Sequence, residues 1–196
     1  NTGNGDAPGT ISLQMGISSP GTDVYLCQKS ETMKTGIFFG STLGTTENIA
    51  GQIATALRIS PDDIHNVADT DPSAVQGYDC LLLGSSTWGA GDLQDDWYDF
   101  LDALKRKALS GKRVALFGCG DSASYPDSFC DALAEIRDGL EATGCTFVGA
   151  LDAAEYDGCT SRICRDGKVI GLAVDDGASE AVSDARMEKW ITAVGF

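Results

Sequence analysis

The chain has 196 residues, of which 42% are hydrophobic and 22% are charged, and this composition suits one folded domain with a sizeable core. It carries 29 acidic against 14 basic residues, giving a formal net charge of −15 and a pI near 4.2. Such a surface repels nucleic acid and anionic membranes and favours basic protein partners. No apolar stretch reaches the length of about 18 residues that crosses a bilayer, so we expect no direct membrane insertion.

Residues 1–33 differ in composition from the rest of the chain. They are rich in Gly, Ser, Thr and Pro, show no helical or strand periodicity and lack the continuous apolar core of a secretory signal. A segment of this kind seldom orders alone. We therefore predict an extended arm over residues 1–33 that packs on its own domain or on a partner, followed by one folded domain over residues 34–196.

Short apolar runs punctuate the domain and are continuous rather than alternating, as in parallel strands that are covered on both faces. The runs are Ile37–Phe39, the weaker Ile64–Val67, Cys80–Leu83, Val114–Phe117 and Phe147–Val148. Longer segments with helical periodicity separate them. Strands that alternate with helices predict an α/β fold with a doubly wound, five-stranded parallel sheet and helices on both faces.

The predicted helices are recognised by apolar stripes. Pro126 suits the start of the third helix, and Gly144 suits the position just past its end. The stripes are Ile49, Ile53, Ala56 and Leu57; Leu93, Trp97, Phe100, Leu101 and Leu104; Phe129, Leu133, Ile136 and Leu140; and Val182, Trp190, Ile191 and Val194.

The loop after the first predicted strand reads GSTLGTT, residues 40–46. Its hydroxyl residues surround Gly44, which lets backbone amides converge at the start of the next helix, where the helix dipole favours an anion. No Lys follows Gly44, which excludes a Walker A loop. The loop predicts a phosphate held by backbone amides, although a simple capped turn explains the same residues equally well.

Two large aromatic residues follow neighbouring strands. Trp88 lies in the loop GSSTWGAGD and Tyr125 in the loop GCGDSASYPD. Because ligands of such sheets bind beyond the carboxyl ends of the strands, these side chains and the first loop are expected to meet. Either aromatic alone could simply pack on its loop, but together with the first loop they predict a site for a planar, phosphorylated ligand.

Residues 34–196 resemble a long-chain flavodoxin of the type found in cyanobacteria and algae. The resemblance rests on FFGSTLGTTENIA, LLLGSSTWGAGDLQDDW, LFGCGDSASYPDSFCDAL and RDGKVIGLAVDD. It implies the strand order 2-1-3-4-5, for which flavodoxin is itself the standard example. It also implies a low-potential one-electron carrier that uses non-covalent FMN and is not an enzyme. The segment from about Leu151 to Lys168 matches the insertion that splits the last strand in long-chain members.

The resemblance assigns the FMN contacts residue by residue. Trp88 and Tyr125 would cover the two faces of the ring system, and Gly89 occupies the position where the family flips a peptide on reduction. One departure is Leu43, because the family has a hydroxyl residue there. The implied phosphate contacts are Ser41, Thr42, Gly44, Thr45 and Thr46, and the implied ring and ribityl contacts are Ser86, Thr87, Gly89, Gly118 and Asp121.

The expected partners follow from the acidic surface and from the resemblance. Acids recur at helical spacing after the Trp88 loop, at Asp92, Asp95, Asp96, Asp99 and Asp102. They are either an ordinary solvated face or a docking face for a basic partner. The resemblance implies photosystem I and ferredoxin–NADP reductase as partners, in photosynthetic electron transfer, and a location in the plastid stroma or the cytoplasm of a photosynthetic organism.

Two other functions stay open. The arm and Leu43 together suggest a flavodoxin-like subunit that residues 1–33 anchor to a larger complex such as a photosystem, as a scaffold or as a tethered carrier. An FMN-dependent quinone reductase shares the fold, but such an enzyme needs an open pocket over the flavin.

The cysteines and the lone histidine indicate no metal site. The sequence has seven Cys residues and no CxxC pair, which favours buried free thiols in a reducing compartment. The spacing of Cys159 and Cys164 would also allow a disulfide within one loop. His65 has no second histidine to form a metal site with it.

Overall fold

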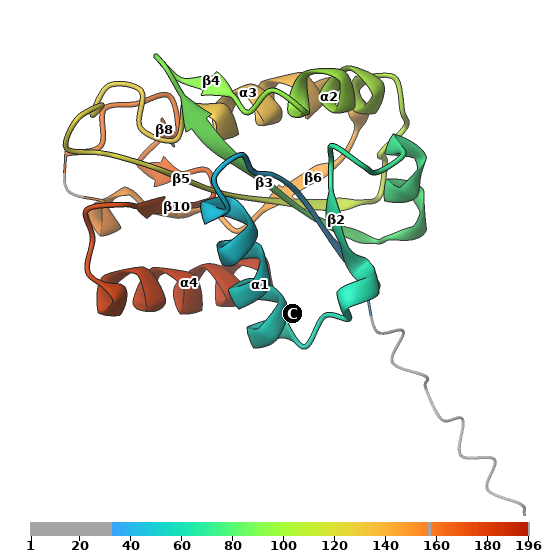
Figure 1. Ribbon diagram of the computed structural model, residues 1–196, viewed down its shortest axis with the longest axis horizontal. Coiled ribbons are helices and arrows are strands. Elements are labelled where there is room, and N and C mark those ends of the chain that lie inside the picture. The colour runs from blue at the N-terminus through green and yellow to red at the C-terminus, as the bar shows by residue number, and fades with distance from the viewer. Residues whose placement is uncertain (1–32, 157, 196) are drawn as a thin grey trace, which may run out of the picture. The chain divides into compact units, whose positions relative to one another are not determined.

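The computed structural model describes residues 33–156 and 158–195 (Figure 1). The predicted arm, residues 1–33, lies outside the described residues except for Met33. The main sheet has the order β10-β5-β3-β1-β2, and neighbouring strands on this path are parallel. The strands are β1 (Thr35–Gly40), β2 (Ile64–Asn66), β3 (Cys80–Trp88), β5 (Arg113–Gly120) and β10 (Leu172–Asp175).

The sheet centre is buried on both faces, which explains why its strands read as continuous apolar runs. Leu81, Leu82 and Leu83 follow one another in β3, and all three have no exposed surface. Side chains of consecutive residues point to opposite faces of a sheet, so both faces must be covered. The prediction of a doubly wound parallel sheet is confirmed.

The last strand position is divided between two segments that both pair with β5. Strand β6 (Thr146–Val148) pairs with the start of β5, and β10 pairs with its end. Between β6 and β10 the chain forms a small antiparallel sheet of order β7-β9-β8. Its strands are β7 (Leu151–Asp152), β8 (Cys164–Arg165) and β9 (Lys168–Val169). The predicted fifth strand, Phe147–Val148, therefore supplies only one half of that position.

Helices cover the two faces of the sheet in pairs, with α2 and α3 on one side and α1 and α4 on the other (Figure 1). The α-helices are α1 (Thr45–Leu57), α2 (Trp97–Lys105), α3 (Asp131–Leu140) and α4 (Glu180–Val194). Short 3-10 helices are η1 (Pro61–Asp63), η2 (Pro72–Gly77), η3 (Glu141–Thr143) and η4 (Ala153–Glu155), and β4 (Asp92–Leu93) pairs with the end of β3.

Several predicted helix details were wrong. Leu93 is buried as predicted but lies in β4, before α2 begins. Helix α3 begins at Asp131 rather than next to Pro126, because residues 121–131 form consecutive turns and Cys130 adopts a left-handed conformation with φ of 54°. Gly144 ends the helical segment, with φ of 81°, as predicted.

The burial phase of two helices also differs from the prediction. In α1, Ala56 is exposed, and Ala50 and Ala54 are buried instead. In α4, Val182 is 42% exposed and Met187 takes a buried position. In both helices, the buried residues are the ones that pack against the sheet. The pattern of apolar residues in the sequence identified only some of them.

His65 belongs to a structural cluster. Its Nε2 lies 2.6 Å from the Tyr78 hydroxyl, and its ring stacks on Phe38 with centroids 4.7 Å apart. The described residues contain no group of three or more His, Cys, Asp or Glu side chains arranged to hold a metal ion. Nor does any helix in this part of the chain combine the length and the apolar character needed to cross a membrane.

Candidate functional site

Two adjoining cavities of about 230 and 180 Å³ lie at the carboxyl ends of β1, β3, β5 and β10. They share Trp88, Asp121 and Tyr125 among their lining residues. The topology places the loops after these strands at one edge of the sheet, which is where the ligand of a doubly wound fold is expected. The predicted residues that line the larger cavity are Ser41, Thr45, Thr46, Ser86, Thr87, Trp88, Asp121 and Tyr125, and Gly89 lines the smaller one.

The loop after β1 presents free backbone amides at the start of α1. Gly44 precedes the helix with φ of 90°, a left-handed conformation that favours glycine. Its own amide donates to Ser41 Oγ at 3.1 Å, while no side chain caps the first amides of α1. Uncapped amides at a helix N-terminus form a binding site for an anion.

Two buried threonine hydroxyls in the site differ in their hydrogen-bond partners. Thr46 Oγ1 is fully buried and lies 3.6 Å from Cys119 Sγ. Thr87 Oγ1 is also buried, but no described residue offers it a hydrogen bond. Leaving a buried hydroxyl unpaired costs about 1–3 kcal/mol. Thr87 lines both cavities through other atoms, since this oxygen has almost no accessible surface, so a ligand in the cavities would not reach it.

Trp88 and Tyr125 flank the cavities with their side chains partly open to solvent, 41% and 57% exposed. The indole Nε1 of Trp88 donates to Ser86 Oγ at 3.0 Å, which fixes the ring without a ligand. Tyr125 is held by a turn in which its amide donates to the Asp121 carbonyl at 3.0 Å. Two exposed aromatic rings beside cavities with a mainly apolar lining and a few polar groups suit a planar ligand.

Asp121 organises the loop that carries Tyr125. Its Oδ1 accepts hydrogen bonds from the amides of Ala123 at 3.0 Å and Ser124 at 2.9 Å. Hydrogen bonds from Ser124 and Ala123 lower the pKa of Asp121, because they stabilise the charged carboxylate. The carboxylate is thus already engaged by its own loop.

Three predicted site residues do not line either cavity. Thr42 Oγ1 accepts a hydrogen bond from Gln94 Nε2 at 3.4 Å, and Gly44 shapes the loop as described above. Gly118 lies within β5, where a Cβ atom would stand 2.4 Å from the Ser85 carbonyl oxygen and 3.0 Å from Leu133. Its glycine therefore permits close packing between β3, β5 and α3.

This packing predicts the effect of Gly118→Ala. The added methyl group should lower the free energy of unfolding by about 1–3 kcal/mol, because the contact atom is backbone and cannot move aside. Gly51→Ala is the matched control, since nothing lies within 4 Å of its Cβ position on α1. That substitution should raise stability by about 0.5–1 kcal/mol. Urea unfolding measures both, and an unchanged Gly118→Ala protein would contradict the packing role.

Gly89 adopts a left-handed conformation next to Trp88. Its φ is 51°, and a Cβ atom would stand 2.7 Å from Asp92 Oδ2. A side chain at this position would meet both backbone strain and the Asp92 carboxylate, so the position favours glycine.

Several residues that line the cavities were not among the predicted contacts, although Leu43 was noted in the sequence as a departure from the family. Leu43 is 82% exposed and lies at the rim, and Asp176 follows β10. The VDD stretch at the carboxyl end of the last strand is the signal that could have identified Asp176. The others are Cys119 and Gly120 in the larger cavity, and Gly120, Ser128, Phe129 and Cys130 in the smaller.

Asp176 makes stability depend on pH. Burial, and then the charges of Asp121 and Asp175, raise its pKa. A carboxyl with a raised pKa in the folded state contributes stability at low pH that is lost as pH rises through that pKa. Asp176→Asn should therefore be more stable than the parent at pH 7, with a gain that shrinks as the pH falls through the carboxyl range. Urea unfolding across pH measures this, and a constant difference would contradict it.

The fold and the site together define a class, the doubly wound α/β proteins that bind a phosphorylated planar ligand at the carboxyl edge of the sheet. A family model described as flavodoxin matches residues 37–190. The chain belongs to the flavodoxin family.

Relatives and solved structures agree with this assignment. Flavodoxin 1 of Salmonella typhimurium is 44% identical over 161 residues, covering 82% of this chain and 92% of that protein. The flavodoxin of the cyanobacterium Picosynechococcus is 36% identical over 159 residues, covering 81% and 94%. The crystal structure of Fusobacterium nucleatum flavodoxin bound to flavin mononucleotide has a TM-score of 0.72 at 30% identity and covers 82% of this chain and 96% of that one.

Proposed function

We propose that this protein binds FMN non-covalently in the two adjoining cavities and serves as a one-electron carrier. The observation that carries the proposal is the combination of uncapped amides at the start of α1 with Trp88 and Tyr125 at the edge of the same cavities. Amides hold a phosphate, and the aromatic side chains hold a flat ring. FMN supplies one-electron chemistry when it is bound.

The residues present fit FMN without any cationic side chain. Ser41, Thr45 and Thr46 would hold the phosphate together with the α1 amides. Leu43 offers no hydroxyl, which could cost about 1.5–3 kcal/mol of phosphate binding, or a factor of ten or more in affinity. Eight of the residues expected to contact FMN nevertheless line the larger cavity, which supports tight binding.

The electrostatics of the site favour a low reduction potential. Asp121 and Asp176 line the larger cavity, and among the described lining residues of both cavities there is no Lys or Arg. Negative charge nearby disfavours adding an electron to a bound cofactor. We therefore infer a carrier that donates electrons at low potential, and family membership supports a carrier over the quinone reductase alternative.

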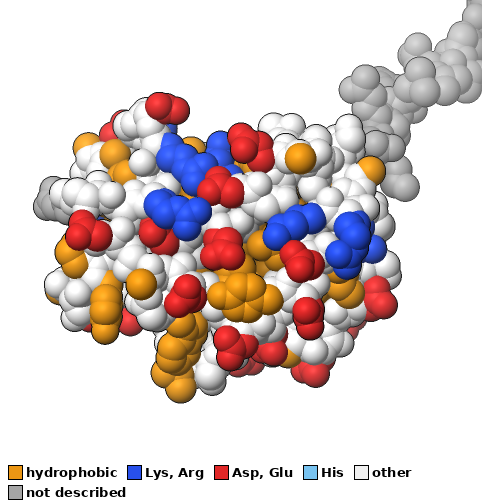
Figure 2. All heavy atoms as spheres, turned by 90° about the horizontal axis from the view of Figure 1, so that it is seen from above, with side chains coloured by type: hydrophobic (Ala, Val, Ile, Leu, Met, Phe, Trp, Pro, Cys, Tyr) orange, Lys and Arg blue, Asp and Glu red, His pale blue; other side chains and the backbone are white. Residues whose placement is uncertain are grey.

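The partner we propose is a redox protein with a basic face. Asp92, Asp95, Asp96, Asp99 and Asp102 are all exposed, although only Asp99 and Asp102 lie on α2 and the predicted helical stripe is thus incomplete. Figure 2 looks onto the side of α2 and α3 and shows acidic side chains over much of it, with basic ones over only part. Complementary charge would speed the encounter of the two proteins and make it sensitive to salt.

The photosynthetic setting of the sequence prediction has weaker support. Flavodoxins of Salmonella typhimurium and Escherichia coli are 44% identical to this chain, against 36% for the cyanobacterial protein. Photosystem I and ferredoxin–NADP reductase therefore stay predictions, as do a plastid location and a complex anchored by residues 1–33. The general proposal of a basic redox partner does not depend on them.

The test is a titration of the apoprotein with FMN and with riboflavin, followed by flavin fluorescence. FMN should bind with one molecule per chain, and riboflavin should bind much more weakly because it lacks the phosphate that the α1 amides would hold. Stepwise reduction of the FMN complex should then proceed in two one-electron steps at low potential. A colourless protein that takes up no FMN at micromolar concentration would overturn the proposal.

A further inference from the structure

Cys159 and Cys164 form a pair of thiols outside the predicted FMN contacts. Both are free and half-buried, at the two ends of a loop, residues 159–164, that we call the dithiol loop. A turn in which the Cys164 amide donates to the Ser161 carbonyl at 3.0 Å brings the second thiol back toward the first. Ser161 Oγ lies 3.6 Å from Cys159 Sγ, and the Cys159 thiol is close enough to raise the pKa of Cys164.

The dithiol loop is fixed on the segment that leads into α3. Three hydrogen bonds from consecutive residues of the loop reach this segment, and two of them involve backbone groups. They join Thr160 Oγ1 to Asp127 Oδ1 at 2.9 Å, Ser161 Oγ to the Phe129 carbonyl at 2.8 Å and the Arg162 amide to Asp131 Oδ1 at 2.8 Å. The thiols are therefore held together by contacts that do not depend on either sulfur.

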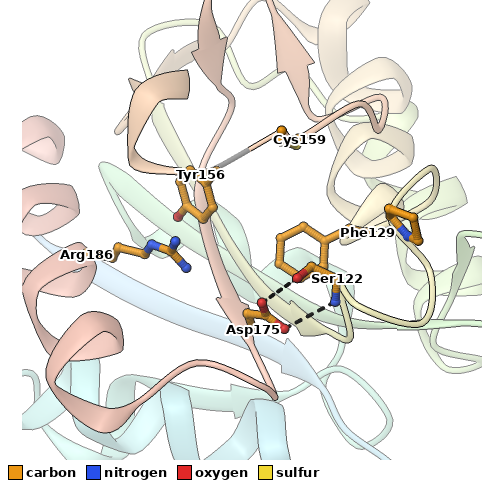
Figure 3. Close-up of a pocket in the computed structure, with 8 residues that line it drawn as sticks. Ser122, Phe129, Tyr156, Cys159, Asp175 and Arg186 are labelled. Carbon is orange, nitrogen blue, oxygen red and sulfur yellow. Dashed lines mark hydrogen bonds between the residues drawn. The ribbon is translucent and has the colours of Figure 1, made fainter.

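Cys159 lines a cavity. A cavity of about 160 Å³ beside the Tyr125 loop is lined by Cys159, and Cys164 is not among its lining residues. Figure 3 shows Cys159 on the loop after Tyr156, near Phe129, with Arg186 and the hydrogen-bonded pair Ser122 and Asp175 further in. The guanidinium of Arg186 lies 4.2 Å from the centre of the Tyr156 ring. A small molecule that enters this cavity can reach the Cys159 sulfur.

The two thiols differ in chemistry as well as in access. Burial, and then the hydrogen bond and charge of Cys159, raise the pKa of Cys164 to about 12. The thiolate is the form that attacks a disulfide, so Cys164 is a poor first nucleophile. Cys164 is instead suited to a second step, the attack on a mixed disulfide that has already formed at the neighbouring Cys159.

We propose that the dithiol loop is a site of reversible thiol–disulfide exchange with a small aliphatic disulfide. The Cys159 thiolate attacks one sulfur of the small disulfide, forms a mixed disulfide and releases one small thiolate. Cys164 then loses its proton to water and attacks the Cys159 sulfur, which releases the second small thiolate. The two protein thiols lose two electrons and two protons, and the small disulfide is reduced to two thiols once its thiolates take up protons.

The first test is a peptide map of the full chain carrying Cys145→Ser. This background is needed because Cys145 and Cys159 lie in one tryptic peptide, residues 138–162, whereas trypsin cuts between Cys159 and Cys164 after Arg162. The reduced protein is treated with oxidised glutathione, alkylated and digested. A link between residues 138–162 and 163–165 that dithiothreitol reverses is the expected result. Absence of that link in the folded protein, or a Cys159 link to Cys27, would overturn the proposal.

The second test separates the roles of the two thiols. Cys164→Ser should stop at the mixed disulfide, so Cys159 should carry at least about tenfold more glutathione than in the Cys145→Ser parent. Cys159→Ser should leave Cys164 unmodified. Glutathione on Cys164 in the latter variant would refute the assigned order. Both readouts are masses and are taken with and without added FMN, so they stand or fall independently of the proposed cofactor.

Discussion

Thr45→Glu should weaken FMN binding by about a thousandfold while leaving the fold at least as stable as the parent. Thr45 is exposed, begins α1 and lines the larger cavity, so a carboxylate there would stand beside the phosphate. Two unit charges about 4 Å apart repel by about 4 kcal/mol at an effective dielectric constant of 20, which is roughly a thousandfold in affinity. The same negative charge stabilises the N-terminus of a helix by about 0.3–1 kcal/mol.

Asn48→Glu is the matched control for this variant. Asn48 is exposed in the first turns of the same helix and lines neither of the two cavities, so the substitution adds the same charge without reaching the proposed phosphate. Its affinity for FMN should stay within about threefold of the parent, because surface charges are screened by solvent and salt. Fluorescence titration and urea unfolding measure both variants. Normal FMN binding by Thr45→Glu would show that the phosphate does not bind at the start of α1.

The location of the site was predictable from the sequence, because the topology of a parallel sheet brings the loops after its strands together at one edge. Ser41, Trp88 and Tyr125 are far apart in the sequence, but each follows a strand that reads as a continuous apolar run. Parallel strands end at one edge, so the position of each residue relative to its strand was enough to place it. The predicted phosphate loop and the two aromatics accordingly line one pair of cavities.

What the sequence could not supply depends on contacts between distant segments. The resemblance implied an insertion that splits the last strand, but the apolar runs identified only its first half, and pairing with β5 shows that β10 supplies the second. Asp176 lies in the site because it follows β10, which was not among the runs interpreted as strands. Gly118 is a different case, because this glycine lies within β5, permits close packing against β3 and does not line either cavity.

The roles of individual residues at the cavity rim also needed the structure. Sequence showed Leu43 as a missing hydroxyl, whereas the structure shows an apolar side chain that is 82% exposed beside Trp88 and Tyr125 in the lining of the larger cavity. The exposure of this side chain follows from the position of its loop at the cavity rim, which the residue type alone does not indicate.

Trp88→Ala should weaken FMN binding by about tenfold to a hundredfold, because stacking of a planar ring on an aromatic side chain contributes about 1–3 kcal/mol. The indole is held by its hydrogen bond to Ser86 Oγ at 3.0 Å, so little further conformational entropy is lost when a ligand binds against it. Trp88→Phe should keep most of the affinity, because it retains a flat ring. The loss of the hydrogen bond to Ser86 should account for a small decrease.

Tyr98→Ala is the control for exposure. Tyr98 is an aromatic side chain of α2 with 44% exposure, close to the 41% of Trp88, but it lines neither cavity, and its removal should leave FMN affinity unchanged. Equal losses in Trp88→Ala and Tyr98→Ala would mean that the effect comes from general destabilisation. A loss confined to Trp88, with riboflavin affected in the same proportion as FMN, would place the ring system and not the phosphate against the indole, because the two ligands share only the ring and its ribityl chain.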